Sequence, residues 1–235
     1  MIDEMLESEY NYVGELYGVD ELDRATRNMA PKERIRAIKR LSSQIRGSRR
    51  SRAEMEKYFK QLPKHVKAEL VRGGLRLADW TIYSIKQITS KTIKMFEPQD
   101  DKEVGVRNIS NAKLPKNSVF LVSGIILLTG TSSDVTDKEA NKAINYRTVS
   151  TIPAIANGEF SLKANKKQIV PENQSNRRFV TDNDHTVQWG YYKLDNPRLI
   201  KDEEVIEFVV ELGTQFQIPN GQFLYAALDG TATTP

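Results

Sequence analysis

The stretch Ser118–Gly130, SVFLVSGIILLTG, contains the longest apolar run of the chain, from Val119 to Thr129. This run has about half of the ~20 residues that an α-helix needs to cross a bilayer, so a membrane-spanning helix is not expected here. A short apolar run of this kind is typical of a buried strand, which we predict over Val119–Leu128. Gly124 and Gly130 then mark a bend or a close packing contact in that strand.

The chain from about Trp80 onward continues this pattern, with period-two alternation or short apolar runs between turn-forming residues. Strands are expected at Thr81–Ile88, Lys91–Phe96, Val119–Leu128, Tyr146–Ile152, Glu159–Lys163, Thr186–Leu194, Glu204–Leu212, Gln215–Ile218 and Gln222–Leu228. About nine strands without an intervening helical pattern predict an antiparallel β-sandwich over residues 76–230. Long connections around residues 97–117 and 131–145 favour a single jelly roll over an up-and-down meander. A flexible tail is expected at residues 231–235.

The first 75 residues predict helices, so we expect an α+β chain with a helical N-terminal region over residues 1–75. Apolar residues of the acidic opening segment recur at helical spacing. A second helix is expected over Pro31–Gly47, and a third begins at Ser51, which has capping-box spacing to Glu54. A last short helix is expected to end at Gly73–Gly74, because glycine readily adopts the left-handed conformation at a helix end.

Charge is segregated along the chain, although the net charge of the whole is only +4. Residues 1–23 hold eight acidic residues and no basic residue, a charge of −8. Residues 24–78 hold seventeen Lys and Arg against four Glu, a charge of +13, and the rest of the chain therefore carries −1. This asymmetry indicates a polyanionic partner for the basic segment rather than for the whole molecule.

The arginine stretch, Arg40–Arg52 (RLSSQIRGSRRSR), carries five arginines in thirteen residues. If one helix ends at Gly47 and the next begins at Ser51, the arginines crowd a corner where free backbone N–H groups already favour anions. Guanidinium groups match phosphate oxygens, which predicts a sequence-independent contact with a nucleic-acid backbone. A solvated corner, or a contact with the acidic first helix of the same or a neighbouring chain, is the alternative. The candidate contact residues are Lys39, Arg40, Arg46, Arg49, Arg50 and Arg52.

Residues that carry enzyme chemistry are scarce in this sequence. It has no cysteine, which excludes disulfides, thiolate metal sites and cysteine nucleophiles. Of the two histidines, His65 lies in a basic helical segment, where we expect a solvated surface position. Two polar loop clusters could offer cation ligands but lack the spacing of a known metal motif. They are Asp134, Asp137 and Glu139, and Asp182, Asp184 and His185. We therefore expect no catalytic residues, cofactor, bound metal or small-molecule substrate.

Four segments of the β-rich part resemble a known class of proteins. They are Trp80–Lys86 (WTIYSIK), Ile93–Phe96 (IKMF), Asn108–Asn111 (NISN) and Leu114–Ile125 (LPKNSVFLVSGI). Their pattern is similar to that of the β-barrel, jelly-roll structural proteins of small tailless bacteriophages, especially those that infect Bacteroidetes. The resemblance covers roughly residues 76–230, and it implies one jelly roll per chain and a major capsid protein. It carries no functional residues with it, because the function of a capsid protein is spread over its contact surfaces.

The hypothesis that follows is a phage major capsid protein that self-assembles into a shell. Its basic helical region would face packaged nucleic acid or neighbouring subunits, and other virion proteins would be further partners. The opening MIDEMLESEY lacks a basic leader and an apolar core, so we expect no secretory signal and a soluble protein in the host cytoplasm and then in the virion. Two alternatives remain open at this stage. They are a non-catalytic nucleic-acid-binding protein with a β oligomerisation domain, and a virion spike or head-fibre protein.

Overall fold

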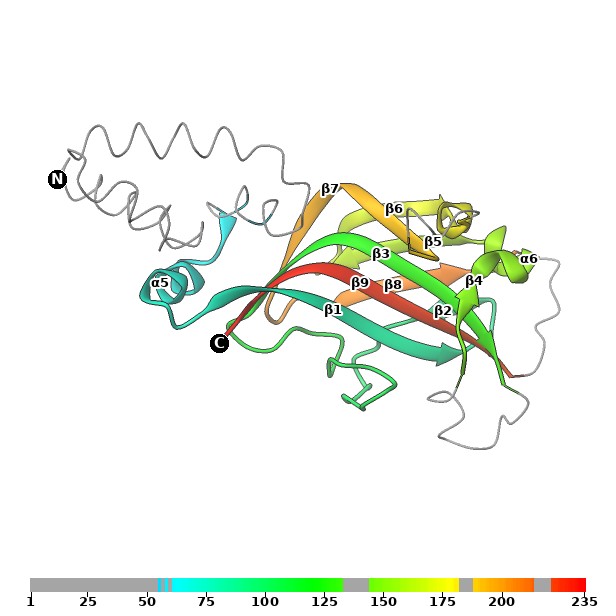
Figure 1. Cartoon of the computed structure of the whole chain (residues 1–235), viewed down its shortest axis with the longest axis horizontal. Coiled ribbons are helices and arrows are strands. Elements are labelled where there is room, and N and C mark those ends of the chain that lie inside the picture. Colours follow the sequence, from blue (N-terminus) through cyan, green and yellow to red (C-terminus); the bar gives the residue numbers. More distant parts are fainter. Residues whose placement is uncertain (1–54, 56–57, 59–60, 133–143, 182–187, 214–220) are drawn as a thin grey trace. The chain divides into compact units, whose positions relative to one another are not determined.

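The structure is a computed structural model, which describes residues 55, 58, 61–132, 144–181, 188–213 and 221–235 (Figure 1). The chain divides into two compact units. One comprises Met1–Ala78 with Thr233–Pro235, and the other comprises Asp79–Ala232. The helices expected between residues 1 and 54 lie outside the described residues, and so does the strand expected at Gln215–Ile218.

The first unit contains one described α-helix, α5, which spans Lys64–Arg72. Val66 and Leu70 are four residues apart and therefore share one face, and both are buried. The helix ends at Gly73, which adopts a left-handed φ of 76° and donates its backbone N–H to the carbonyl oxygen of Leu70. The predicted helix end at the glycine pair is thus confirmed, because a residue without Cβ meets no steric penalty in this conformation.

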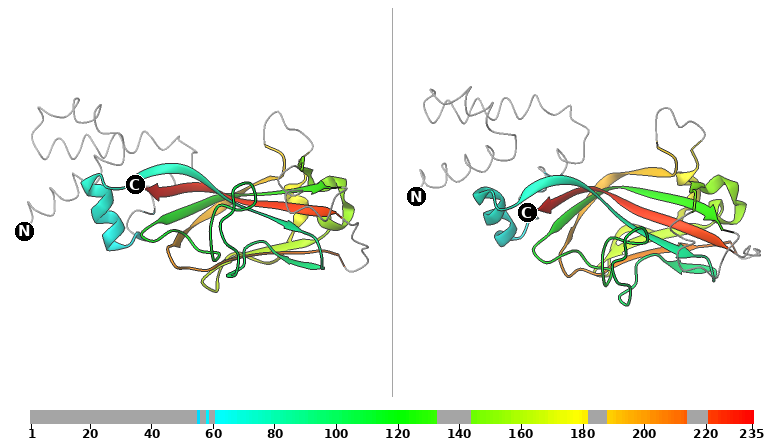
Figure 2. Two further views of the ribbon diagram at one scale, coloured as in Figure 1. Left: turned by 90° about the horizontal axis from the view of Figure 1, so that it is seen from below. Right: turned by 60° about the horizontal axis from the view of Figure 1, so that its bottom comes forward.

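The second unit is built from two β-sheets. The strands are β1 (Arg76–Gln87), β2 (Thr92–Lys94), β3 (Val119–Thr131), β4 (Arg147–Thr148), β5 (Glu159–Ala164), β6 (Lys167–Ser175), β7 (Tyr191–Lys201), β8 (Ile206–Glu211) and β9 (Gln222–Thr234). The division into units assigns residues 76–78 of β1 and 233–234 of β9 to the first unit. The first sheet has the order β1-β9-β3-β4, with β7 also paired to β3, and the second has the order β2-β8-β5-β6. Figure 2 shows the sheets as two layers. The predicted antiparallel β architecture is confirmed.

The strands pair in a nested order when the two-residue strand β4 is set aside. The first strand, β1, pairs with the last, β9, and β2 pairs with β8. Further inward, β3 pairs with β7 and β5 pairs with β6. The contacts Thr81–Asp229 and Ile88–Gln222 place β1 antiparallel to β9, since the second residue number falls as the first rises. This order arises when a long antiparallel hairpin folds over on itself. The strand pairs, taken from the outermost to the innermost, then lie alternately in the first and the second sheet.

One hydrophobic core is shared by the two sheets. Strand β3 contributes Phe120 and Val122 before a register shift, and Ile125 and Leu127 after it. The register shifts between Val122 and Gly124 against both neighbouring strands. The residues of β3 that point into the core are therefore even-numbered before the shift and odd-numbered after it. Gly124 sits at this bulge against the ring of Tyr191, as its predicted place at a bend or close contact requires. Burial of apolar surface between the sheets is the main stabilising term of such a domain.

Several predicted strand limits are wrong, and the reasons are local. Strand β6 was not expected, because Pro171 and a run of polar residues obscure it, but proline is tolerated in an edge strand. Strand β7 begins later than predicted and continues through Pro197, where its register against β3 shifts. Tyr146–Ile152 forms only the short β4 before the 3-10 helix η4, Val149–Thr151. Strand β9 runs to Thr234, so the expected tail at 231–235 is largely strand.

Candidate assembly and binding surfaces

The six candidate contact residues of the sequence lie outside the residues that the structure describes. They are Lys39, Arg40, Arg46, Arg49, Arg50 and Arg52. Their grouping at a helix corner therefore stays a prediction. The same holds for the loop residues Asp134, Asp137, Glu139, Asp182, Asp184 and His185. His65 is described, and it lies exposed on α5 as predicted.

Over the described ranges, no group of three or more His, Cys, Asp and Glu side chains is placed to hold a metal ion.

No helix within the described part of the chain is both long enough and apolar enough to span a membrane.

The open edge of β1 is covered by the long connection between β2 and β3 (Figure 1). The Asn108 side chain accepts a hydrogen bond from the backbone N–H of Tyr83 at 2.9 Å and donates one to the carbonyl oxygen of Thr81 at 2.7 Å. Further along β1, Ile85 donates its backbone N–H to the carbonyl oxygen of Val106 at 2.9 Å. These bonds occupy backbone groups that would otherwise form a free sheet edge, so the edge is closed to strand pairing with another chain over Thr81–Ile85.

An ionic cluster fastens the same connection to β1. The Lys86 ammonium lies 2.7 Å from one oxygen each of Glu97 and Asp100, and Arg107 lies 3.4 Å from the other Asp100 oxygen. The hydrogen bond from Lys86 lowers the pKa of Glu97 below its ordinary value. All four side chains are less than one third exposed. The cluster therefore has a structural role, because two cationic and two anionic side chains balance each other in charge.

The sheet of β2, β8, β5 and β6 has one buried face and one open face. In β8, Phe208 and Val210 are buried while the alternate residues Glu207 and Glu211 are exposed. The same alternation holds along β5. The charged residues of the open face are Glu159, Glu172, Glu207, Glu211, Lys94 and Lys163. Four carboxylates against two ammonium groups give it a net charge of −2, and we call it the acidic face.

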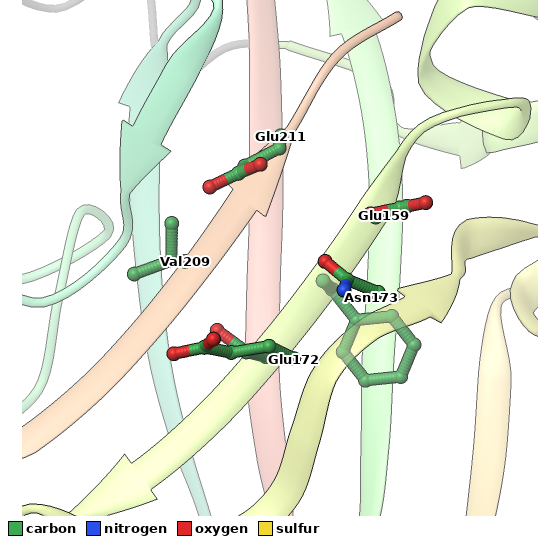
Figure 3. Close-up of a pocket in the computed structure, with 7 residues that line it drawn as sticks. Glu159, Glu172, Asn173, Val209 and Glu211 are labelled. Atoms are coloured by element: carbon green, nitrogen blue, oxygen red, sulfur yellow. The ribbon is translucent and has the colours of Figure 1, made fainter.

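Three of these acidic residues line a small hollow of about 60 Å³ (Figure 3). Glu211 comes from β8, Glu159 from β5, and Glu172 with Asn173 from β6. Glu159 and Glu211 stand directly opposite each other in the antiparallel pair of β5 and β8. Like charges in that position repel, and the side chains of these two residues have no ion-pair or hydrogen-bond partner among the residues described. Negative potential therefore concentrates at this hollow.

The third carboxylate, that of Glu172, is paired with Lys163. The hydrogen bond between them lowers the pKa of Glu172 and raises the pKa of Lys163. Glu207 lies opposite Lys163 in the pairing of β5 with β8 and also favours its charged form. Lys163 is thus shared between two carboxylates, Glu172 and Glu207.

A larger hollow of about 330 Å³ adjoins the first, since Val209 lines both. Its apolar lining includes Phe96, Pro98, Val205, Phe208 and Val209. Lys94, Glu97, Gln99 and Glu207 supply polar groups around this lining. A volume of this size is at the lower end of the range for ligand-binding pockets. The acidic face thus combines carboxylates with an apolar depression.

The first sheet, β1-β9-β3-β4, carries a half-buried carboxylate, Asp229 on β9, on the face that points away from the core. Burial raises its pKa above the ordinary value, against the lowering effect of a hydrogen bond of 3.0 Å from the Thr81 hydroxyl, while the charge of Asp79 raises it further. A raised pKa means that the ionised carboxylate costs stability at pH values above it. This cost falls as the pH drops through the folded-state pKa and is absent below the unfolded-state pKa, where both states are protonated.

The variant Asp229→Asn is therefore expected to be slightly more stable than the wild type at pH 7, by on the order of 0.5 kcal/mol, because the side chain is half exposed and solvent screens it. The amide oxygen can still accept the Thr81 hydrogen bond. Urea unfolding at several pH values checks this, and the gain should vanish near pH 3. The exposed Asp195→Asn is the control and should leave the stability at pH 7 unchanged.

Comparisons with known proteins provide no relative: no protein-family model matches the chain, and no curated protein matches it.

The acidic face could be found only in part from the sequence. The spacing of Glu207, Val209 and Glu211 on a predicted strand indicates that two carboxylates share one face. The opposition of Glu159 and Glu211 depends on the register between β5 and β8, which strand patterns alone do not specify. The contribution of Glu172 was hidden because β6 was not expected.

Proposed function

We propose that the protein is a viral structural protein, a phage major capsid protein whose β domain is a single jelly roll that tiles a shell. The observation that supports this best is the nested pairing of β1 with β9, β2 with β8, β3 with β7 and β5 with β6. An eight-stranded, two-sheet domain of this kind is common in viral capsids, although lectins and cupins use it too. The resemblance of residues 76–230 to phage structural proteins favours the capsid among these classes.

The distribution of charge and of open surface agrees with a repeating assembly. The acidic face is available for subunit contacts, whereas the edge of β1 is closed by the β2–β3 connection. The basic segment 24–78 would attract packaged nucleic acid or an acidic protein surface. Many weak contacts, each repeated in every subunit, can stabilise a closed shell. The proposed partners are thus other copies of this chain, nucleic acid and further virion proteins, and the proposed location is the virion.

Electron microscopy of the purified full chain tests this proposal. We expect closed shells or regular capsomers at micromolar concentrations. If contacts between protein subunits hold the particles together, the particles should persist after nuclease treatment. Loss of the particles after nuclease would assign assembly to nucleic acid while keeping the structural role. A monodisperse small oligomer that never assembles over a range of salt and protein concentrations would contradict the proposal.

A nucleic-acid-binding protein is the second candidate, favoured by the +13 charge of residues 24–78. The β domain would then hold a small oligomer together, and the N-terminal region would bind a nucleic-acid backbone. Tight, sequence-dependent duplex binding by a particle-free dimer would favour this candidate, because a shell interior needs only salt-sensitive, sequence-independent contacts.

A further inference from the structure

We propose that the acidic face of the β2-β8-β5-β6 sheet is the docking surface for the arginine stretch, residues 40–52, of a neighbouring copy of this chain. The inference rests on the proposed function only in requiring that copies meet. It assigns to the arginine stretch a protein partner, where the sequence alone left nucleic acid and protein equally open.

Charge complementarity is the first argument. The arginine stretch carries five positive charges and no negative charge. The acidic face has a net charge of −2. Glu159 and Glu211 lie opposite each other at the edge of the small hollow, and neither carboxylate has an ion-pair partner within the part of the chain that the structure describes. A planar guanidinium group can donate to two carboxylates at once, and it would remove the repulsion between them. At about 60 Å³ the hollow has room for more than one water-sized group, so a guanidinium group fits it by volume.

The apolar depression is a second and independent argument. A purely solvated acidic surface needs no hollow lined by Phe96, Phe208 and Val209, yet this hollow lies beside the carboxylates. The arginine stretch contains Leu41 and Ile45 among its charges, so it can offer apolar side chains to the depression and guanidinium groups to the carboxylates. The carboxylates of this face repel the negative charge of a nucleic-acid backbone, which disfavours nucleic acid as its partner.

The carboxylates of Glu159 and Glu211 are exposed to solvent, which makes each ion pair that they form weak. Exposed ion pairs each contribute little, so a single docked segment exchanges rapidly and escapes detection in dilute solution. Repetition in an assembly makes the same contact effective, because each subunit offers one stretch and one face. A covalent trap is therefore the appropriate measurement.

The chain has no cysteine, so introduced cysteines report proximity without background. One copy carries Ser48→Cys within the arginine stretch, and a size-tagged copy carries Ser161→Cys, which lines the small hollow. The two are mixed in nuclease-treated, low-salt buffer and oxidised, and disulfide heterodimers are counted on non-reducing gels. A disulfide requires Cα atoms within about 7 Å, so it reports docking at the hollow. The matched control replaces Ser161→Cys by Ser150→Cys, an exposed position on η4.

We expect the Ser48–Ser161 cysteine pair to give at least about five times more heterodimer than the control pair. The double substitution Glu159→Gln/Glu211→Gln in the Ser161→Cys copy should lower this yield about fivefold. Neutralising two exposed carboxylates elsewhere, Asp101→Asn/Asp195→Asn, should leave the yield unchanged. Equal trapping at both serines, or a yield insensitive to the glutamate substitutions, would overturn the inference.

Microscopy of the same samples separates this inference from the proposed function. Shells without the heterodimer would overturn the docking surface and leave the capsid role standing. Heterodimers in a protein that never forms shells or capsomers would support the docking surface and count against the capsid role.

Discussion

Replacing Phe160 with alanine is expected to lower the free energy of unfolding of the β domain by about 3–5 kcal/mol, a large part of the ~5–15 kcal/mol typical of a folded domain. Phe160 on β5 is only 1% exposed. Its ring centroid lies 4.7 Å from that of Phe179, 6.1 Å from that of Phe208 and 6.2 Å from that of Tyr192. Phe208 and Tyr192 belong to different sheets, so truncation leaves a cavity where the two sheets meet.

Urea unfolding followed by tryptophan fluorescence and circular dichroism measures this loss. The control is Val104→Ala, because Val104 is 83% exposed and its truncation should change stability by less than about 0.5 kcal/mol. A loss below about 1 kcal/mol for Phe160→Ala would show that Phe160 is not at the centre of a core shared by both sheets.

The sequence predicts the elements whose local signals are strong. The apolar run of β3, the alternation of β5 and β8, and the glycine pair after α5 each identify an element to within a few residues. In each case the signal lies in consecutive residues: continuous burial, period-two burial or a left-handed helix end. The general architecture of antiparallel sheets followed from the number of such segments.

The parts that the sequence did not predict depend on partners distant in the chain. The turn between β5 and β6 uses Asn165 and Lys166, both with positive φ, rather than the usual Asn-Gly pair, so the hairpin was not visible. The bulge before Gly124 changes which residues of β3 point inward, and it is specified by pairing with β7 and β9 together. Strand order itself is a property of long-range contacts.

The same distinction holds for the candidate surfaces. A cluster of like charges close together in sequence, such as the arginine stretch, is evident from composition. The carboxylates of the acidic face come from three separate strands, β5, β6 and β8, and only the strand register shows that Glu159 lies opposite Glu211. Surfaces made by sheets are therefore harder to predict than those made by one continuous segment.

Replacing Gly230 with alanine is expected to lower the free energy of unfolding by about 3 kcal/mol or more, although only one methyl group is added. Gly230 on β9 lies opposite Val122, next to the register shift of β3. A Cβ there would overlap the carbonyl oxygen of Leu121 and lie 3.1 Å from Cζ of Phe120. Backbone atoms in the centre of a sheet cannot move without breaking ladder hydrogen bonds on both sides, so the overlap is not relieved cheaply.

The matched control for this substitution is Gly213→Ala, since no atom of the described residues lies within 4 Å of a Cβ built at Gly213 and its φ is not positive. We expect that variant to be unchanged or more stable by about 0.4–1 kcal/mol, because alanine restricts the unfolded chain. Urea unfolding of the two variants compares one added methyl group in a closed and in an open environment. Equal stabilities would mean that β9 and β3 do not approach each other at Gly230 as closely as the strand pairing requires. The order β1-β9-β3-β4 of the first sheet would then lose its central pairing.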